Sequence, residues 1–202
     1  MDEKKEYILK NVGKLYLRYG IKSVTMDDVA RELGISKKTL YDFFKDKEEL
    51  VDQSINYYMK NPVIDFDCCD DMNAIDKFFL YREHGLKMLR LYNNNIDFDL
   101  KRMYPRINKK LQEFKKKRIY GQNYKMLEQG INEGLFRSDL NIDIVARLQV
   151  GRILLTMNVN NAIFKEEEIR SESFFDAVMD YHLHAICTEK GLAYYKQKLN
   201  NA

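Results

Sequence analysis

The stretch from Thr25 to Leu50, TMDDVARELGISKKTLYDFFKDKEEL, constrains the fold of this chain more than any other part of the sequence. Thr25 followed three residues later by Asp28 is typical of a helix N-cap, and Gly34 would end that helix in a turn. Ser36 can then cap a second helix. Two short capped helices joined by a glycine turn predict a helix-turn-helix.

The second helix of this motif has two chemically different faces. At about 100° per residue, its apolar side chains share one side, namely Leu40, Phe43 and Phe44. On the outer side Lys38 and Asp42 point away, flanked by Thr39 and Tyr41. Amines and hydroxyls in such a position are suitable donors to DNA bases and phosphates. A solvated surface helix in an ordinary bundle would show the same pattern, so both interpretations stay open at this level.

Helical patterns prevail along the rest of the sequence. Only two prolines, Pro62 and Pro105, interrupt the 202 residues, and no run shows sustained alternation of apolar and polar residues. We therefore expect an all-α fold. Beside the central motif, helices are expected over 3–19, 47–60, 72–92, 96–103, 105–133, 142–163 and 173–189, with Gly191 ending the last.

Composition changes near residue 60, where an acidic stretch begins. Residues 62–100 hold eight Asp/Glu against four Lys/Arg, and the segment 64–71 has the composition of a loop or linker. The sequence thus predicts two domains, 1–60 with the helix-turn-helix and 61–202 with the remaining helices. The whole chain has a formal net charge of only +3, so binding to nucleic acid must depend on where charge is placed.

Several classes of protein and site are disfavoured by what the sequence lacks. The first residues show no secretory signal and no run is apolar enough to span a membrane, so we expect a cytoplasmic protein. Cys68 and Cys69 are adjacent and Cys187 is distant, which favours free thiols over disulfides or zinc. His182 and His184 lie on different faces of a helix and cannot easily share a metal ion. No catalytic or phosphate-loop motif is present, so neither an enzyme nor a cofactor is expected.

The pattern T-x-x-x-V-A-x-x-x-G-I-S-x-x-T-L-Y-x-F-F-x-x-K-E-x-L, within the span from Tyr7 to Leu50, resembles the N-terminal signature of the tetracycline-repressor (TetR) family. This resemblance implies a transcription regulator, expected to be a repressor, that binds a palindromic DNA operator as a homodimer. It implies a three-helix DNA-binding domain and a larger helical domain that binds a small-molecule inducer and dimerises. The alternative is an all-helical protein-interaction module that does not bind DNA.

Carried over by position, the resemblance assigns DNA-binding roles to residues of the motif. Thr39 and Tyr41 would contact the DNA backbone or base edges, and Lys47 would hold a phosphate. Thr25 would cap its helix next to the DNA backbone. Lys37 and Lys38 would stand at the entrance of the helix that reads bases.

The sequence departs from the family pattern at Lys38 and Asp42, so these two residues are expected to set its own operator preference. Asp42 can accept a hydrogen bond from cytosine N4, or it can form an ion pair with Lys38 one turn earlier. We favour the ion pair. A further basic segment, from Lys101 to Arg118, holds nine basic residues and one acid. It can be a second DNA contact or a solvated helix face, and the solvated face is favoured.

Two sets of residues are candidates for interfaces in the larger domain. Two long helices are apolar over wide arcs, which suggests a dimer interface formed by Leu148, Gly151, Leu155, Phe174, Val178, Tyr181 and Ala185. Candidates for a ligand pocket are Phe78, Phe79, Leu86, Tyr104, Tyr120, Tyr124, Leu127 and Met157. Such side chains are also common in a plain core, but a pocket lined by them would predict a lipophilic inducer.

Overall fold

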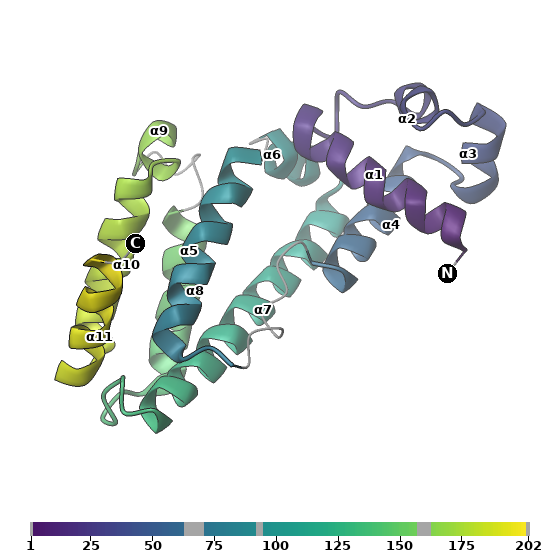
Figure 1. Cartoon of the computed structure of the whole chain (residues 1–202). Coiled ribbons are helices and arrows are strands. Elements are labelled where there is room, and N and C mark those ends of the chain that lie inside the picture. The colour runs from purple at the N-terminus through teal and green to yellow at the C-terminus, as the bar shows by residue number, and fades with distance from the viewer. Residues whose placement is uncertain (1, 63–70, 92–94, 157–162, 201–202) are drawn as a thin grey trace. The chain divides into compact units, whose positions relative to one another are not determined.

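A computed structural model describes residues 2–62, 71–91, 95–156 and 163–200. Over these ranges the chain is helical (Figure 1), which confirms the expected all-α fold. The only extended pairing in the described ranges is an isolated bridge between Phe136 and Cys187. The helices are α1 (Glu3–Tyr19), α2 (Met26–Glu32), α3 (Lys37–Phe43), α4 (Lys47–Lys60), α5 (Ala74–Leu91), α6 (Asn95–Met103), α7 (Pro105–Asn132), α8 (Ile142–Thr156), α9 (Glu166–Ile169), α10 (Glu172–Ile186) and α11 (Glu189–Asn200).

Side-chain caps fix where the helices of the N-terminal region begin. The hydroxyl of Thr25 accepts a hydrogen bond from the amide of Asp28 at 3.1 Å, and the Asp28 carboxylate accepts one from the Thr25 amide at 3.0 Å. The side chains of Ser36 and Asp46 cap α3 and α4 in the same way. Since the first turn of a helix leaves amides without helical partners, these caps stabilise each start as expected.

The chain forms two compact units. One contains Met1–Ile64 together with Leu91–Lys115, and the other contains Asp65–Arg90 together with Lys116–Ala202. The first unit therefore holds α6 and the start of α7 in addition to α1–α4.

The core of the first unit is built from apolar faces on helices that are distant in sequence. Helix α1 lies against α4. The buried side chains include Ile8 and Val12 of α1, Leu40 of α3, Leu50 and Val51 of α4, Leu100 of α6 and Leu111 of α7. Burying these faces together holds α2 and α3 on the rest of the unit.

The core of the second unit draws on α5, α7, α8, α10 and α11. Its buried side chains include Ile75, Phe78, Leu127, Ala146, Met179, Leu183 and Tyr195. Cys187 is buried next to them, and burial raises the pKa of its thiol to about 12. Cys68 and Cys69 lie outside the described residues.

The C-terminal region differs from the sequence-based expectation. Helix α10 ends at Ile186, and Gly191 lies inside a further helix, α11, instead of ending the preceding one. The reason is packing: a Cβ at Gly191 would lie 2.1 Å from the carbonyl oxygen of Leu135. Glycine is needed here for close approach and not for a helix stop, and the two uses look the same in sequence.

Candidate nucleic-acid interface

The turn between α2 and α3 is rigidly built. Gly34 has φ 63°, a left-handed backbone that side chains other than glycine rarely adopt. The amide of Ile35 donates to the carbonyl of Ala30 at 3.0 Å, so the chain after the turn is tied back to α2. Ala30 and Leu40 are buried in the same core. This combination fixes the angle between the two helices, as a helix-turn-helix requires.

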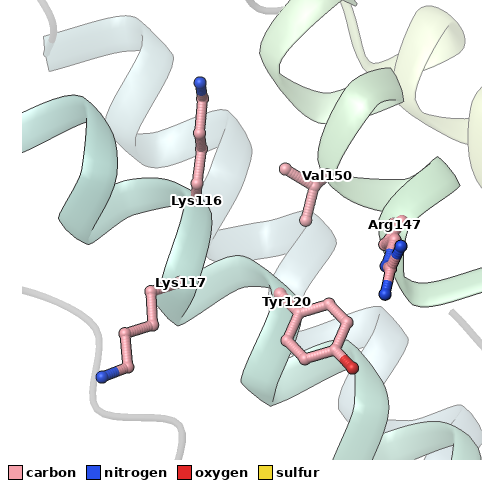
Figure 2. A pocket seen from close by; sticks show the side chains of 5 residues that line it. All are labelled: Lys116, Lys117, Tyr120, Arg147 and Val150. Atoms are coloured by element: carbon pink, nitrogen blue, oxygen red, sulfur yellow. The ribbon is translucent and has the colours of Figure 1, made fainter. Parts of the chain in front are cut away.

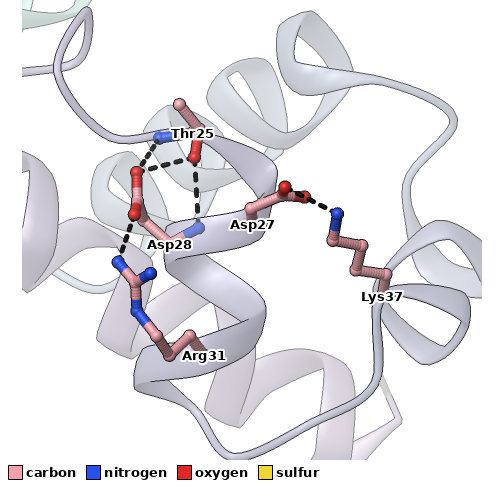
Figure 3. A network of polar contacts seen from close by, with 5 residues as sticks. All are labelled: Thr25, Asp27, Asp28, Arg31 and Lys37. Atoms are coloured by element: carbon pink, nitrogen blue, oxygen red, sulfur yellow. Dashed lines mark hydrogen bonds and ion pairs between the residues drawn. The ribbon is translucent and has the colours of Figure 1, made fainter.

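Figure 3 shows a polar network that joins α2 to its cap and to α3. Hydrogen bonding to Thr25 is the main cause that lowers the pKa of Asp28, and the neighbouring charge of Arg31 also contributes. Lys37 forms an ion pair with Asp27 at 2.6 Å. The ammonium of Lys37 is therefore held toward α2 in the protein without DNA.

The outer edge of α3 carries the side chains that sequence reasoning placed there. Lys38 and Asp42 are exposed, Tyr41 is 50% exposed, and the hydroxyl of Thr39 lies 2.9 Å from that of Ser36. The expected ion pair between Lys38 and Asp42 is not formed, and neither side chain has an ion-pair partner among the described residues. A solvated pair spaced four residues apart stabilises a helix by only about 0.3–0.5 kcal/mol, so its absence is unsurprising.

Lys47 is positioned by contacts that involve α6. Its ammonium donates a hydrogen bond to the carbonyl oxygen of Lys22 at 3.2 Å. Burial lowers the pKa of Lys47, while the nearby charges of Asp99 and Asp28 oppose that shift. Asp99 also accepts a hydrogen bond from the amide of Lys22 at 2.7 Å. The side chain expected to hold a phosphate is thus kept at one place on the first unit.

Asp99 was missed by sequence reasoning. It lies on α6, is only 5% exposed, and sits beside the fully buried Leu100. The available signal was an acid next to the apolar stripe of a short amphipathic helix. The acidic composition of residues 62–100 concealed it, because one more carboxylate there looks like part of a solvated face.

The basic segment from Lys101 to Arg118 is partly neutralised by acids of the same unit. Lys110 lies 3.6 Å from Asp52, and Lys115 lies 3.5 Å from Asp97. These ion pairs favour the interpretation of the segment as a solvated, internally paired face.

A shallow hollow of about 310 Å³ lies between α7 and α8 in the second unit (Figure 2). It is lined by Lys116, Lys117, Tyr120, Arg147 and Val150. The Tyr120 hydroxyl donates to Asp143 at 2.8 Å, and Arg147 forms an ion pair with the same carboxylate. The amines of Lys116 and Lys117 point away from Tyr120. The polar groups of Tyr120 and Arg147 in this hollow are therefore already bonded to Asp143.

The other expected pocket residues are distributed over both cores. Phe78, Phe79, Tyr124 and Leu127 belong to the core of the second unit, and Leu86 is also buried. Tyr104 belongs instead to the core of the first unit. Met157 lies outside the described residues.

The expected dimer residues lie largely on the surface of the second unit. Leu148, Gly151 and Leu155 are exposed along one side of α8, and Tyr181 and Ala185 are exposed on α10. Leu148 is 67% exposed and Tyr181 is 76% exposed. Phe174 and Val178 are half-buried.

The two histidines of α10 have separate environments. His182 is buried and hydrogen bonds with Gln149, whereas His184 is exposed and lies 3.2 Å from Asp180. No group of three metal-ligating side chains occurs within the described ranges. None of the helices described is long and apolar enough to cross a membrane.

Comparison with known proteins agrees with this geometry. Residues 8–53 match the family model for bacterial regulatory proteins of the tetR family. Over 58 residues the chain is 40% identical to YhgD, an uncharacterised helix-turn-helix regulator of Bacillus subtilis. That match spans 29% of this chain and 30% of the relative.

Two further matches extend beyond the N-terminal region. The repressor KstR2 of Mycobacterium tuberculosis is 24% identical over 150 residues, which cover 69% of this chain and 72% of that protein. The crystal structure of a transcriptional regulator from Cytophaga hutchinsonii superposes with a TM-score of 0.75 at 21% identity, covering 93% of this chain and 100% of the other. By their names, the first is a transcriptional repressor and the second a transcriptional regulator. The N-terminal motif of the chain thus matches the tetR family of bacterial regulatory proteins, and its fold is similar to that of a solved transcriptional regulator along most of its length.

Proposed function

We propose that this protein is a homodimeric transcription regulator that binds a palindromic operator through α3 and acts as a repressor in the cytoplasm. The observation that carries the proposal is the capped, glycine-linked pair α2 and α3, whose outer edge presents Lys38, Tyr41 and Asp42 to solvent. In this proposal residues 1–60 form the DNA-binding domain, and residues 61–202 form the domain for ligand binding and dimerisation.

A two-fold dimer supplies the second recognition helix. Helix-turn-helix dimers place their recognition helices about 34–36 Å apart, so that both enter the major groove on one side of the DNA. The exposed apolar side of α8 and α10 supports this role, because Leu148, Leu155 and Tyr181 would otherwise stay in water. A two-fold interface uses the same patch on both copies.

A small-molecule ligand would act by shifting a conformational equilibrium. If the ligand binds more tightly to a dimer whose recognition helices are wrongly spaced, operator affinity falls by the same coupling free energy. The mixed core of the second unit, rich in Phe, Tyr and Met, supports a ligand with an apolar body.

The test is a titration of the full-length dimer with a labelled duplex taken from the DNA upstream of its own gene. The double variant Tyr41→Phe with Lys47→Ala should abolish the mobility shift, because both side chains are assigned contacts with DNA. Lys87→Ala, which removes an exposed lysine from α5, is the matched control and should bind as the wild type does. Sedimentation should show dimers for all three proteins.

Retained binding by the double variant would reject the assignment of these two residues. Absence of a shift by wild-type protein over a range of salt concentrations would favour the alternative, an all-helical module that docks onto another protein.

A further inference from the structure

A buried polar cluster links α8 and α10 in the second unit. The Nε atom of Arg152 donates a hydrogen bond to the side-chain oxygen of Gln149 at 2.6 Å. The Gln149 amide in turn contacts the imidazole of His182. Gln149 is only 3% exposed and His182 only 7% exposed. Three polar side chains thus meet in a unit whose buried core includes Ala146 of α8 and Leu183 of α10.

Arg152 differs from four other arginines of this unit, because it has no acidic partner among the described residues. Within the described part of the chain, no carboxylate forms an ion pair with its guanidinium. Acidic partners do accompany four other arginines, in the pairs Arg82–Asp176, Arg137–Asp139, Arg147–Asp143 and Arg170–Glu166. A half-buried cation that is bonded to a neutral amide alone is costly for a folded protein.

Among the described residues, no carboxylate forms an ion pair that compensates the positive charge of Arg152. Burial lowers the pKa of its guanidinium to about 10, although this group stays charged at neutral pH. Burial, and secondarily the charge of Arg152, lowers the pKa of His182 to about 3, so the imidazole is neutral. The cluster of Gln149, Arg152 and His182 therefore carries a net charge of +1.

The geometry of the cluster suits an oxyanion next to an apolar group. Gln149 occupies the Nε–H of Arg152, and the two terminal NH₂ groups donate no hydrogen bond to any of the described residues. These groups form the fork that binds a carboxylate or phosphate by paired, charge-assisted hydrogen bonds. The Phe78 ring lies 5.4 Å from the His182 ring, centroid to centroid, and supplies an apolar wall beside the polar cluster.

We propose that Arg152, oriented by Gln149, anchors the carboxylate or phosphate group of a small amphipathic effector in the second unit. The apolar body of the effector would lie toward the aromatic core near Phe78. This inference rests on the proposed function for its effect on DNA binding, while the binding of the anion itself requires no DNA.

The experiment measures ligand binding to the full-length protein by calorimetry. The probes are straight-chain carboxylates from butanoate to decanoate, the matching alkyl phosphates, and the uncharged alcohols of the same length. Wild-type protein should bind at least one anionic series at least about tenfold more tightly than the alcohol of equal length, the difference that a charge-assisted hydrogen bond provides. The preferred series distinguishes a carboxylate from a phosphate ligand.

Two variants of α8 test whether Arg152 binds the anion. Arg152→Met should weaken binding of the anion at least about tenfold and leave the alcohol unaffected, because it removes only the charged fork. Arg147→Met, which changes an exposed arginine of the same helix already paired with Asp143, should leave both affinities unchanged. Equal binding of the anion by wild-type protein and Arg152→Met would overturn the proposal, as would failure of every anionic probe to bind the wild type.

A measurement without ligand separates this role from a structural one. If Arg152 is kept for an effector, Arg152→Met should raise the melting temperature of the ligand-free protein, because an uncompensated charge is replaced by an apolar side chain. A lower melting temperature would contradict the proposal and indicate a structural hydrogen bond. Weaker dimerisation of Arg152→Met would also contradict it, because it would show that an acid of the second copy is the partner. Anion binding by a protein that never binds DNA would remove the proposed function and leave this inference standing.

Discussion

At the scale of single residues, a few polar side chains are buried among apolar ones, among them Asp99, Gln149 and His182. His182 is the clearest case for stability, since its imidazole is enclosed by Gln149, Arg152 and the Phe78 ring. A histidine that is neutral when folded must take up a proton on unfolding at low pH. Its environment therefore makes stability dependent on pH.

The pKa of His182 falls from 6.5 to about 3 on folding. The contribution of His182 to the free energy of unfolding is complete above pH 6.5. It is lost as the pH falls toward 3, by at most about 1.4 kcal/mol per pH unit. His182→Gln should therefore flatten the curve of unfolding free energy against pH between pH 6.5 and pH 4. Urea titrations at several pH values measure this slope, and parallel curves for the two proteins would contradict the assignment.

At the scale of elements, α6 is tied to the DNA-binding unit by more than apolar packing. The Asp99 carboxylate accepts a hydrogen bond from the backbone between α1 and α2 and lies near Lys47 at the start of α4. The Asp99 side chain of α6 thus interacts with the segment between α1 and α2 and lies near the start of α4. Its loss would leave the amide of Lys22 in a part-buried place without its acceptor, and would remove one of two carboxylates near the partly buried ammonium of Lys47.

Asp99→Ala should lower the free energy of unfolding by about 1–3 kcal/mol, because it removes a hydrogen bond to a charged acceptor. Asp97→Ala on the same helix is the matched control, because its ion pair with Lys115 is half-exposed and should contribute about 0–1 kcal/mol. Chemical denaturation of both variants checks the difference. Equal decreases in the free energy of unfolding would show that Asp99 stabilises the unit no more than Asp97 does.

Sequence reasoning succeeded at elements whose signals are local. The caps at Thr25 and Ser36 satisfy the free amides of a helix start, and α2 and α3 begin where these residues predict. It failed where the cause is an interaction distant in sequence. Gly191 resembles a helix stop but serves close packing on Leu135.

Exposed ion pairs were equally hard to predict. Lys38 and Asp42 have suitable spacing on one helix, yet Lys37 pairs with Asp27 across the turn instead. The free energies that decide between such pairs are a few tenths of a kcal/mol. The cluster of Gln149, Arg152 and His182 was also invisible, because its members lie on two helices more than thirty residues apart.

At the scale of the whole molecule, the proposed regulator requires two copies of the chain. Leu148→Glu places a charge in the centre of the exposed apolar side of α8 and should convert the dimer to a monomer, because a charge in an apolar interface loses hydration without a partner. Leu199→Glu changes an exposed leucine of α11 and should leave the dimer intact. Sedimentation velocity distinguishes the two, and a dimeric Leu148→Glu variant would place the interface elsewhere.

Binding of DNA by α3, with Lys47 holding a phosphate, underlies the whole proposed function. The decisive measurement is the salt dependence of binding to the upstream duplex, followed by fluorescence anisotropy for wild-type protein and Lys47→Ala. We expect two subunits per duplex and a logarithmic salt slope that becomes shallower by about 0.9 for each phosphate that is no longer neutralised, hence by about 1.8 per dimer. Wild-type binding that does not respond to salt, or an identical slope for Lys47→Ala, would show that this mode of DNA binding is wrong.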